Sequence, residues 1–285
     1  MWFEIHAAPE GKDFEEMKKI CLTSENSGFD LFTLTDHLMN MRNPNGAENH
    51  PLECWTTLAG LAAVTNKIKL GTLVTCYAYR LPTVLAKMAT TVDIISGGRL
   101  IFGVGAGWHE EEFKGFIGRF PPKRERLRGL RETVEICKSM FTQERTTYHG
   151  RMYQIDNVLN SPQPVQKPVP ILIGGSGEKV TLKIAAEHAD ISHIVTSDLD
   201  TLDHKLAVLE KHCENVGRDY NDIRKGSFMR MNGITKYATM DHVVKRIEEY
   251  QDRGIDLVTF LAHGSSSEVD NNIELIAKEV LPHFK

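Results

Sequence analysis

The chain has 285 residues, of which 41% are hydrophobic and 25% are charged, a balance typical of a soluble globular protein and not of a disordered or fibrous one. Its net charge of -4 argues against nucleic acid or an anionic membrane as a partner, because both need a concentrated basic surface, and favours a small molecule. The five cysteines are scattered without C-x-x-C spacing, and the first residues show no basic segment followed by an apolar run. No apolar stretch approaches bilayer length, so neither secretion nor membrane insertion is expected, and a reducing cytoplasm is.

Short apolar runs alternate with stretches of helical period along the first half of the chain. The expected strands are Trp2–Ala7, Asp30–Asp36, Ile68–Thr75 and Arg99–Gly105, since each is a brief apolar or β-branched run. The expected helices are Asp13–Ser27, Cys54–Asn66, one that opens at Pro82, and Lys123–Phe141. Pro82 suits a first helical turn because its missing N–H costs little there. These segments predict four β-α units.

The second half continues the alternation after one interruption. The segment Thr146–Ile155 predicts a hairpin that turns at His149 and Gly150 and forms an insertion. The expected strands that follow are Val169–Gly175, Ala189–Val195, Lys225–Gly233 and Ile255–Ala262, and the expected helices are Gly177–His188, Thr201–Val216, Thr239–Arg253 and Glu268–Pro282. Eight units predict an α/β protein, a closed (β/α)8 TIM barrel in a single domain over residues 1–285, with a doubly wound open sheet as the alternative.

In such a barrel the site lies at the C-terminal ends of the strands. Asp36 and His37 follow an apolar strand directly, which favours His37 as a general acid or a substrate-orienting donor. Alternatively, Asp36 binds only loop amides. The other strand ends carry His6, Thr75–Tyr77, Gly105–His109, Gly174–Gly177, His193, Arg230 and His263. For any single histidine among them, a strand end that meets solvent is the simpler interpretation.

Two glycine-rich segments follow strands. Gly174–Gly177 would place free amides at a helix start, where a phosphate binds well, with Ser176 and Lys179 as further contacts, although the segment could be only a tight turn. In the other segment, Gly105 and Gly107 are expected to keep the strand end open and Trp108 to form a wall. Glu110–Glu112 are expected to be mostly solvated or helix-starting acids, and without H-E-x-x-H or H-x-H spacing no metal site is predicted.

The segments Gly28–Leu38, Leu52–Ala63, Lys67–Thr75, Tyr79–Leu100, Gly103–Phe113 and Val169–Asp190 together resemble, in the same order, the luciferase-like monooxygenase family. Within the family the chain is most similar to the branch predicted to use coenzyme F-420, an 8-hydroxy-5-deazaflavin, and less similar to the luciferases that use FMN. The resemblance implies a homodimer of barrels with insertions. It also implies a bulge in the third strand, with a cis peptide bond at Leu73–Val74 or an adjacent bond.

The resemblance further implies where the coenzyme would bind. The pyrimidine end of its ring would meet backbone amides near Leu73, Val74, Thr75 and Cys76, and Asp36 would contact the coenzyme. Ala106 and Gly107 would line its middle, and its phosphate would bind Gly174, Gly175, Ser176 and Gly177. His37 corresponds to a histidine near the reactive carbon. This chain departs from its relatives at Trp108, where a glutamate is common, and at Ser192–His193, where many have tryptophan, so the acid–base residue does not transfer from the resemblance.

The leading hypothesis is hydride transfer between F-420 and a small organic substrate, with His37 as proton donor. An FMN-dependent monooxygenase is the first alternative, a non-catalytic protein that binds flavin or deazaflavin is the second, and a metal-dependent hydrolase is the last. The substrate pocket is expected to form from the loops Met39–Pro51, Arg145–Asn160 and His263–Glu268, whose shapes do not follow from sequence.

Overall fold

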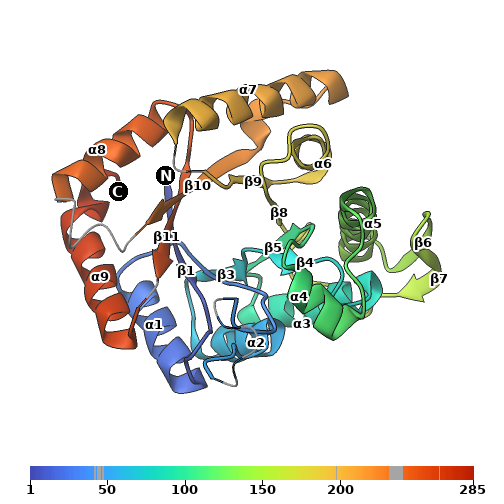
Figure 1. The fold of residues 1–285 in the computed structure, drawn as a ribbon, viewed down its shortest axis with the longest axis horizontal. Helices are drawn as coiled ribbons and strands as arrows, with labels where there is room; N and C mark the ends of the chain where they lie inside the picture. The colour runs from blue at the N-terminus through green and yellow to red at the C-terminus, as the bar shows by residue number, and fades with distance from the viewer. Residues whose placement is uncertain (42, 44–45, 47, 197, 231–239, 263) are drawn as a thin grey trace.

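The computed structural model describes the whole chain except residues 42, 44–45, 47, 197, 231–239 and 263. Its main sheet consists of parallel strands in the order β3-β2-β1-β11-β10-β9-β8-β5-β4, and a further pairing of β3 with β5 closes it (Figure 1). The strands are β1 (Trp2–Ala7), β2 (Leu31–Leu34), β3 (Lys69–Thr72), β4 (Thr75–Cys76), β5 (Leu100–Gly105), β8 (Ile171–Gly174), β9 (Ile191–Ile194), β10 (Arg224–Arg230) and β11 (Leu257–Ala262).

The third barrel strand is divided in two. Leu73 and Val74 separate β3 from β4, and both pieces pair with β5, so they share one barrel position. Eight positions therefore close the sheet, as the sequence predicts, and the open-sheet alternative is wrong.

Helices surround the barrel (Figure 1): α1 (Phe14–Asn26), α2 (Cys54–Val64), α3 (Pro82–Ser96), α5 (Lys123–Thr142), α6 (Thr181–His188), α7 (Leu199–Val216), α8 (Met240–Gln251) and α9 (Ser266–Glu279). Local signals explain several starts. Asp13 and Glu16 form a capping box at α1, and Pro82 occupies the first turn of α3. Short elements α4 (Glu110–Glu112), η1 (Phe113–Ile117), η2 (Tyr220–Asp222) and η4 (Leu281–His283) lie between the longer ones.

One helix start was predicted wrongly. The sequence predicts a helix from Gly177, but α6 begins at Thr181. The preceding residues form turns in which the Gly177 carbonyl accepts a hydrogen bond from the amide of Leu182, five residues on. Hydrogen bonds in an α-helix join residues four apart. The wider turn at Gly177 is therefore not helical, and the helix begins only at Thr181.

The predicted hairpin is present. It consists of β6 (Arg145–His149) and β7 (Gln154–Leu159), paired antiparallel, and it lies beside α5 on the outside of the barrel (Figure 1). The carboxylate of Glu132 on α5 accepts hydrogen bonds from three successive amides in the turn, those of Arg151, Met152 and Tyr153. The insertion is thus fixed to α5.

Side chains inside the barrel form layers, because alternate residues of each strand point inward. One apolar layer contains Leu31, Ile101, Leu172, Ile191 and Leu257. Thr33, His193 and Thr259 come two residues after Leu31, Ile191 and Leu257, so they form a polar layer beyond it, toward the C-terminal ends of the strands, and Glu4 joins them there.

Two of the histidines expected at strand ends are buried. His193 is completely buried in the interior polar layer, and His6 is 5% exposed, so neither side chain simply meets solvent. His263 lies outside the described residues, and Arg230 is the last residue of β10. Among the helices of the described ranges, none has the length and apolarity that crossing a membrane requires.

Candidate active site

A cavity of about 350 Å³ opens at the C-terminal ends of the strands, the end where barrel enzymes bind their ligands. Its volume lies in the range typical of small-molecule sites. The predicted site residues that line it are Asp36, His37, Leu73, Val74, Thr75, Cys76, Ala106, Gly107, Gly174 and Gly175. Thus the barrel brings together residues from four separate segments, while Ser176 and Gly177 lie next to the lining residues and do not belong to them.

The side chain of His37 is held by a buried carboxylate. Its Nδ1 lies 2.8 Å from Oε2 of Glu112, while the amide of Leu38 and the hydroxyl of Tyr79 also donate to Glu112. Burial by itself raises the pKa of Glu112, but the hydrogen bonds from His37, Tyr79 and the Leu38 amide outweigh it and lower that pKa below its ordinary value. Glu112 is therefore an ionised acceptor that keeps a proton on Nδ1 of His37 and leaves Nε2 for a molecule in the cavity.

The expectation for Glu110–Glu112 is confirmed in part, because all three begin the short helix α4 and Glu110 and Glu111 are exposed. The side chain of Glu112, however, is completely buried and not solvated. The short helix α4 turns Glu112 inward next to Phe113, which is also completely buried. The one local signal was this neighbouring phenylalanine, because it marks the side of the turn that faces the core. The partner His37 is 75 residues away.

Asp36 forms a second wall of the cavity through an ion pair. Both of its carboxylate oxygens bind the guanidinium of Arg80, at 2.7 and 2.9 Å. The Thr75 hydroxyl and the Cys76 amide donate to the same carboxylate, and Trp55 Nε1 donates to the Thr75 oxygen at 2.6 Å. Asp36 is thereby already bound on both oxygens, so it fixes β4 in place and offers little free acceptor capacity.

Burial also keeps the Cys76 thiol protonated, because desolvation raises its pKa to about 12. The residue Cys76 is 5% exposed. Its sulfur lies close to Gly107, since a Cβ atom at that position would come within 2.6 Å of it. Cys76 is therefore a neutral packing group in the cavity wall and no thiolate nucleophile.

The peptide bond between Leu73 and Val74 is cis, which confirms the expectation for the third strand. The Val74 side chain lies between two other strand ends. A Cβ atom at Gly105 would come within 2.5 Å of Val74 Cγ2, and one at Gly174 within 2.8 Å of Val74 Cγ1. These glycines therefore make room for Val74, a reason for their presence that differs from the open strand end that the sequence suggests.

The segment predicted to bind phosphate follows β8. Gly175 has a φ of 129°, a backbone conformation that favours glycine, and its amide donates to the carbonyl of His193. The Ser176 hydroxyl accepts a hydrogen bond from the Val195 amide. Thr181, the first residue of α6, lines the cavity. Any anion site here is therefore centred closer to Thr181 than the sequence suggests.

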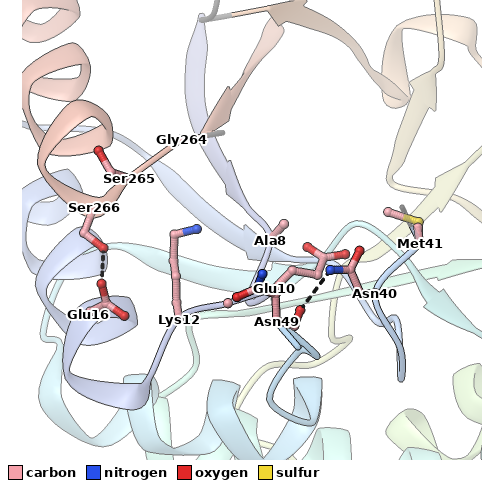
Figure 2. Close-up of a pocket in the computed structure, with 11 residues that line it drawn as sticks. Ala8, Glu10, Lys12, Glu16, Asn40, Met41, Asn49, Gly264, Ser265 and Ser266 are labelled. Atoms are coloured by element: carbon pink, nitrogen blue, oxygen red, sulfur yellow. Dashed lines mark hydrogen bonds between the residues drawn. The ribbon is translucent and has the colours of Figure 1, made fainter. Parts of the chain in front are cut away.

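A second cavity, of about 550 Å³, opens at the same end of the barrel (Figure 2). Its lining follows β1, β2 and β11 and is mostly polar, with Glu10, Lys12, Asn40, Asn49, Ser265 and Ser266. Two of the loops expected to form the substrate pocket thus contribute, those at 39–51 and 263–268. No described residue of the third loop, the hairpin at 145–160, lines either cavity; the hairpin lies outside the barrel against α5.

The described residues contain no group of three histidine, cysteine, aspartate or glutamate side chains placed to hold a metal ion. Residues 2–231 match the family model described as luciferase-like monooxygenase. The chain belongs to the luciferase-like monooxygenase family.

Relatives of this chain are named for different functions. A pyrimidine monooxygenase of Acinetobacter baylyi is 30% identical over 99% of this chain and 77% of its own length. An F420-dependent glucose-6-phosphate dehydrogenase of Nakamurella multipartita is 31% identical over 78% of this chain and 64% of its own. A further relative, from Mycobacterium bovis, is 33% identical to this chain, and the chain spans 61% of the length of that relative.

Among solved structures, the coenzyme F420-dependent tetrahydromethanopterin reductase of Methanopyrus kandleri superimposes with a TM-score of 0.83. The superposition covers 100% of this chain and 99% of the reductase, at 21% sequence identity. At that identity the likeness establishes the luciferase-like barrel and no particular activity.

Proposed function

We propose that this luciferase-like protein is a coenzyme F-420-dependent oxidoreductase, which transfers a hydride between the deazaflavin and a small organic substrate. The observation that carries the proposal is the placement of His37. Its Nδ1 is bound by the ionised Glu112, and the ring lines a cavity of about 350 Å³ at the barrel mouth. The F420-dependent relative supports the choice of coenzyme.

The described residues fit a flat heterocyclic ring with polar edges. Leu73, Val74, Ala106 and Phe228 supply apolar surface to the cavity. The Thr35 hydroxyl is buried, Thr35 lines the cavity, and the hydroxyl has no hydrogen-bond partner among the described residues. A buried polar group without a partner favours a ligand that supplies one.

In the proposed binding mode, Leu73, Val74, Thr75 and Cys76 contact the ring, as do Asp36, Ala106 and Gly107. Gly174, Gly175, Ser176 and Gly177 bind the phosphate, with Thr181 added from the structure. The amides of Ser176 and Gly177 support this placement, since they have no acceptor among the described residues.

The bound coenzyme would supply the hydride chemistry, and the protein would supply orientation and proton transfer. Because Glu112 keeps the proton on Nδ1 of His37, the free Nε2 accepts the hydroxyl proton of a substrate that is oxidised. In the reverse direction, the protonated imidazole donates a proton to the carbonyl oxygen that is reduced. Trp108 packs edge-on against His37 at 5.7 Å between ring centroids and shields the imidazole from water.

A polar substrate suits the second cavity, since the segment after β2 borders both cavities. In Figure 2 the Lys12 ammonium extends between the loops that follow β1 and β11. No ion pair of Lys12 occurs within the part of the chain that the structure describes. A substrate with an anionic or hydroxyl group is therefore proposed, with its reacting carbon beside His37.

Titration of the purified protein with F-420, FMN and FAD tests the coenzyme, with fluorescence as the measurement. We expect F-420 to bind at micromolar concentration or below. Binding of FMN together with no binding of F-420 would contradict the proposal.

An FMN-dependent monooxygenase is the second candidate, favoured by the 30% identity with the pyrimidine monooxygenase over 99% of this chain. Its chemistry consumes oxygen, whereas hydride transfer to or from F-420 does not. Oxygen uptake with reduced FMN therefore separates the two candidates. A non-catalytic binding protein, the third candidate, would keep its coenzyme affinity and its cellular role after His37→Ala.

We also propose that the protein is a single-domain cytoplasmic homodimer. All five cysteines are free and buried, which fits a reducing compartment. Leu81, Val84 and Ile95 on or beside α3 are 64%, 50% and 43% exposed, which supports burial of this face by a second copy. Light scattering of wild type and Val84→Glu tests this; a monomeric wild type would contradict it.

A further inference from the structure

Five buried side chains form a continuous hydrogen-bonded chain across the interior of the barrel. Glu4 is at its centre, where Oε1 accepts the Thr33 hydroxyl and Oε2 accepts the Thr259 hydroxyl at 2.6 Å. The Thr33 oxygen lies 2.8 Å from Nδ1 of His6, and the Thr259 oxygen lies 2.9 Å from Nε2 of His193. The order along the chain is His6–Thr33–Glu4–Thr259–His193.

The proton on each threonine sets the direction of the hydrogen bonds. If Glu4 is ionised, both hydroxyls donate to it, so both imidazoles donate an N–H to the threonine oxygens. His193 then carries its proton on Nε2, which agrees with the lack of a partner at its buried Nδ1 within the part of the chain that the structure describes. If Glu4 is protonated, it donates to one threonine, whose hydroxyl must turn to an imidazole nitrogen that carries no proton. The charge of Glu4 and the tautomer of a histidine are therefore linked.

Outside the hydrogen-bonded chain itself, which includes His6, no cation forms an ion pair or a hydrogen bond with Glu4 among the described side chains. The neighbouring strands β2 and β11 contain no ionisable residue, and His193 on β9 is neutral because burial lowers its pKa to about 3. Lys69 and Arg224 both lie against Trp2, at the beginning of β1, and Lys225 lies over Tyr220. Burial accordingly raises the pKa of Glu4 to about 7, despite the hydrogen bonds from Thr259 and Thr33.

The hydrogen-bonded chain from His6 to His193 lies one layer of side chains below the floor of the 350 Å³ cavity. Thr35 and Val195 line the cavity and come two residues after Thr33 and His193, which corresponds to a rise of about 7 Å along a strand. The ring of Phe228, which also lines the cavity, is centred 5.9 Å from the ring of His6 and 4.4 Å from that of His193. A charge in the cavity and a charge on Glu4 are thus separated by a thin, water-poor layer.

We propose that Glu4 is a proton store beneath the cavity, which takes up one proton from solvent when negative charge arrives above it. This rests on the proposed function, because a hydride carries two electrons with its proton and so makes the ring more negative by one unit. One proton added to Glu4 restores the net charge, while the substrate's own hydroxyl proton goes to His37. Glu4 contacts neither the coenzyme nor the substrate, so it acts on the reaction only through its charge.

Infrared spectroscopy of the coenzyme-free protein tests the store directly. At a pH of about 6, between the ordinary value of 4.5 and the value of about 7 for Glu4, wild type should show the C=O stretch of a protonated carboxylic acid. That band should disappear as the pH rises through about 7, and it should be missing in Glu4→Gln. The control Glu132→Gln, which replaces a buried carboxyl on α5 outside the barrel, should keep the band.

A second variant covers the case in which Glu4→Gln does not fold. Thr259→Val keeps the shape of the side chain but removes one hydroxyl that stabilises the carboxylate, so the band should persist to higher pH than in wild type. The proposal that Glu4 stores a proton is contradicted if wild type lacks the band at a pH of about 6. It is also contradicted if the band in both variants is the same as in wild type.

The response to charge is measured with bound F-420. Chemical reduction in weak buffer at a pH of about 8, with an indicator dye, should show greater proton uptake by wild type than by Glu4→Gln, while Glu132→Gln should match wild type. Equal uptake in all three proteins overturns the link between Glu4 and the cavity. If wild type binds only FMN, the proposed function fails, but reduction of bound FMN still tests the role of Glu4. If neither coenzyme binds, the infrared result alone decides whether Glu4 stores a proton.

Discussion

Glu112 and Glu4 are both completely buried carboxyl groups, yet their pKa values move in opposite directions. The pKa of Glu112 is lowered, because an imidazole, a phenol and an amide donate to it. The pKa of Glu4 is raised to about 7, because only two threonine hydroxyls oppose its burial. The number and type of donors therefore decide the charge of a buried carboxyl, and the barrel uses one carboxyl as a fixed anion and the other as a site that binds a proton.

The largest expected effect concerns the imidazole that Glu112 holds. His37→Ala should lower turnover by roughly 10²- to 10⁴-fold, the usual contribution of general acid–base catalysis, because Nε2 is the group that exchanges the proton. Steady-state kinetics with F-420 measure this change. Added imidazole should restore part of the activity, and coenzyme affinity should remain. Turnover that stays at the wild-type level would show that His37 transfers no proton.

Replacement of Glu4 should change the pH dependence of stability. Its pKa is raised above the ordinary 4.5 to about 7, so the folded state keeps a proton that the unfolded state has lost, and the free energy of unfolding falls as pH rises through this window. The total is about 3 kcal/mol, from about 1.4 kcal/mol per pH unit. Glu4→Gln should therefore gain about 3 kcal/mol relative to wild type between pH values of about 4 and 8.

The measurement has to compare the two proteins, because His193 acts in the opposite sense. Its pKa is lowered to about 3, so the free energy of unfolding rises with pH up to its unfolded value near 6.5. Both proteins share this contribution, and it cancels in the difference. Chemical denaturation over the pH range gives that difference, and a constant difference would contradict the raised pKa of Glu4.

Glu112→Gln should have a smaller effect on turnover than loss of the imidazole. A hydrogen bond to a charged group contributes about 1.5 to 3 kcal/mol, so the loss is expected to be roughly ten- to a hundredfold. Glu111→Gln, its exposed neighbour on α4, should behave like wild type. Equal activity of the two variants would mean that Glu112 does not orient His37.

The smallest expected effect concerns packing between the strand ends. Gly174→Ala should cost roughly 1 kcal/mol of stability, the lower end of the range for overpacking, because the new Cβ would come within 2.8 Å of Val74 Cγ1. In a Val74→Ala background the cost should disappear. Thermal denaturation of the two single variants and the double variant tests this coupling, and additive effects would refute it.

The sequence determined the eight β-α units and the end of the barrel that carries the site. Both follow from local patterns, since strand and helix periods and turn residues act over a few positions. Asp36 and His37 were predicted at the C-terminal end of a barrel strand, and both line the cavity. Val74 also lines it, but this residue was expected there from the family resemblance alone. The interruption of the third strand was expected from the family resemblance alone.

Only the tertiary structure decided which of the buried carboxyl groups are charged. The contact between His37 and Glu112 spans 75 residues, and that between Glu4 and Thr259 spans 255, distances over which no local pattern carries information. Whether a carboxyl is a solvated acid, a fixed anion or a proton store depends on which donors the closed barrel brings to it and on how much water it excludes. Glu112 appears in the sequence as the third of three similar acids, and Glu4 appears as one polar residue in an apolar strand.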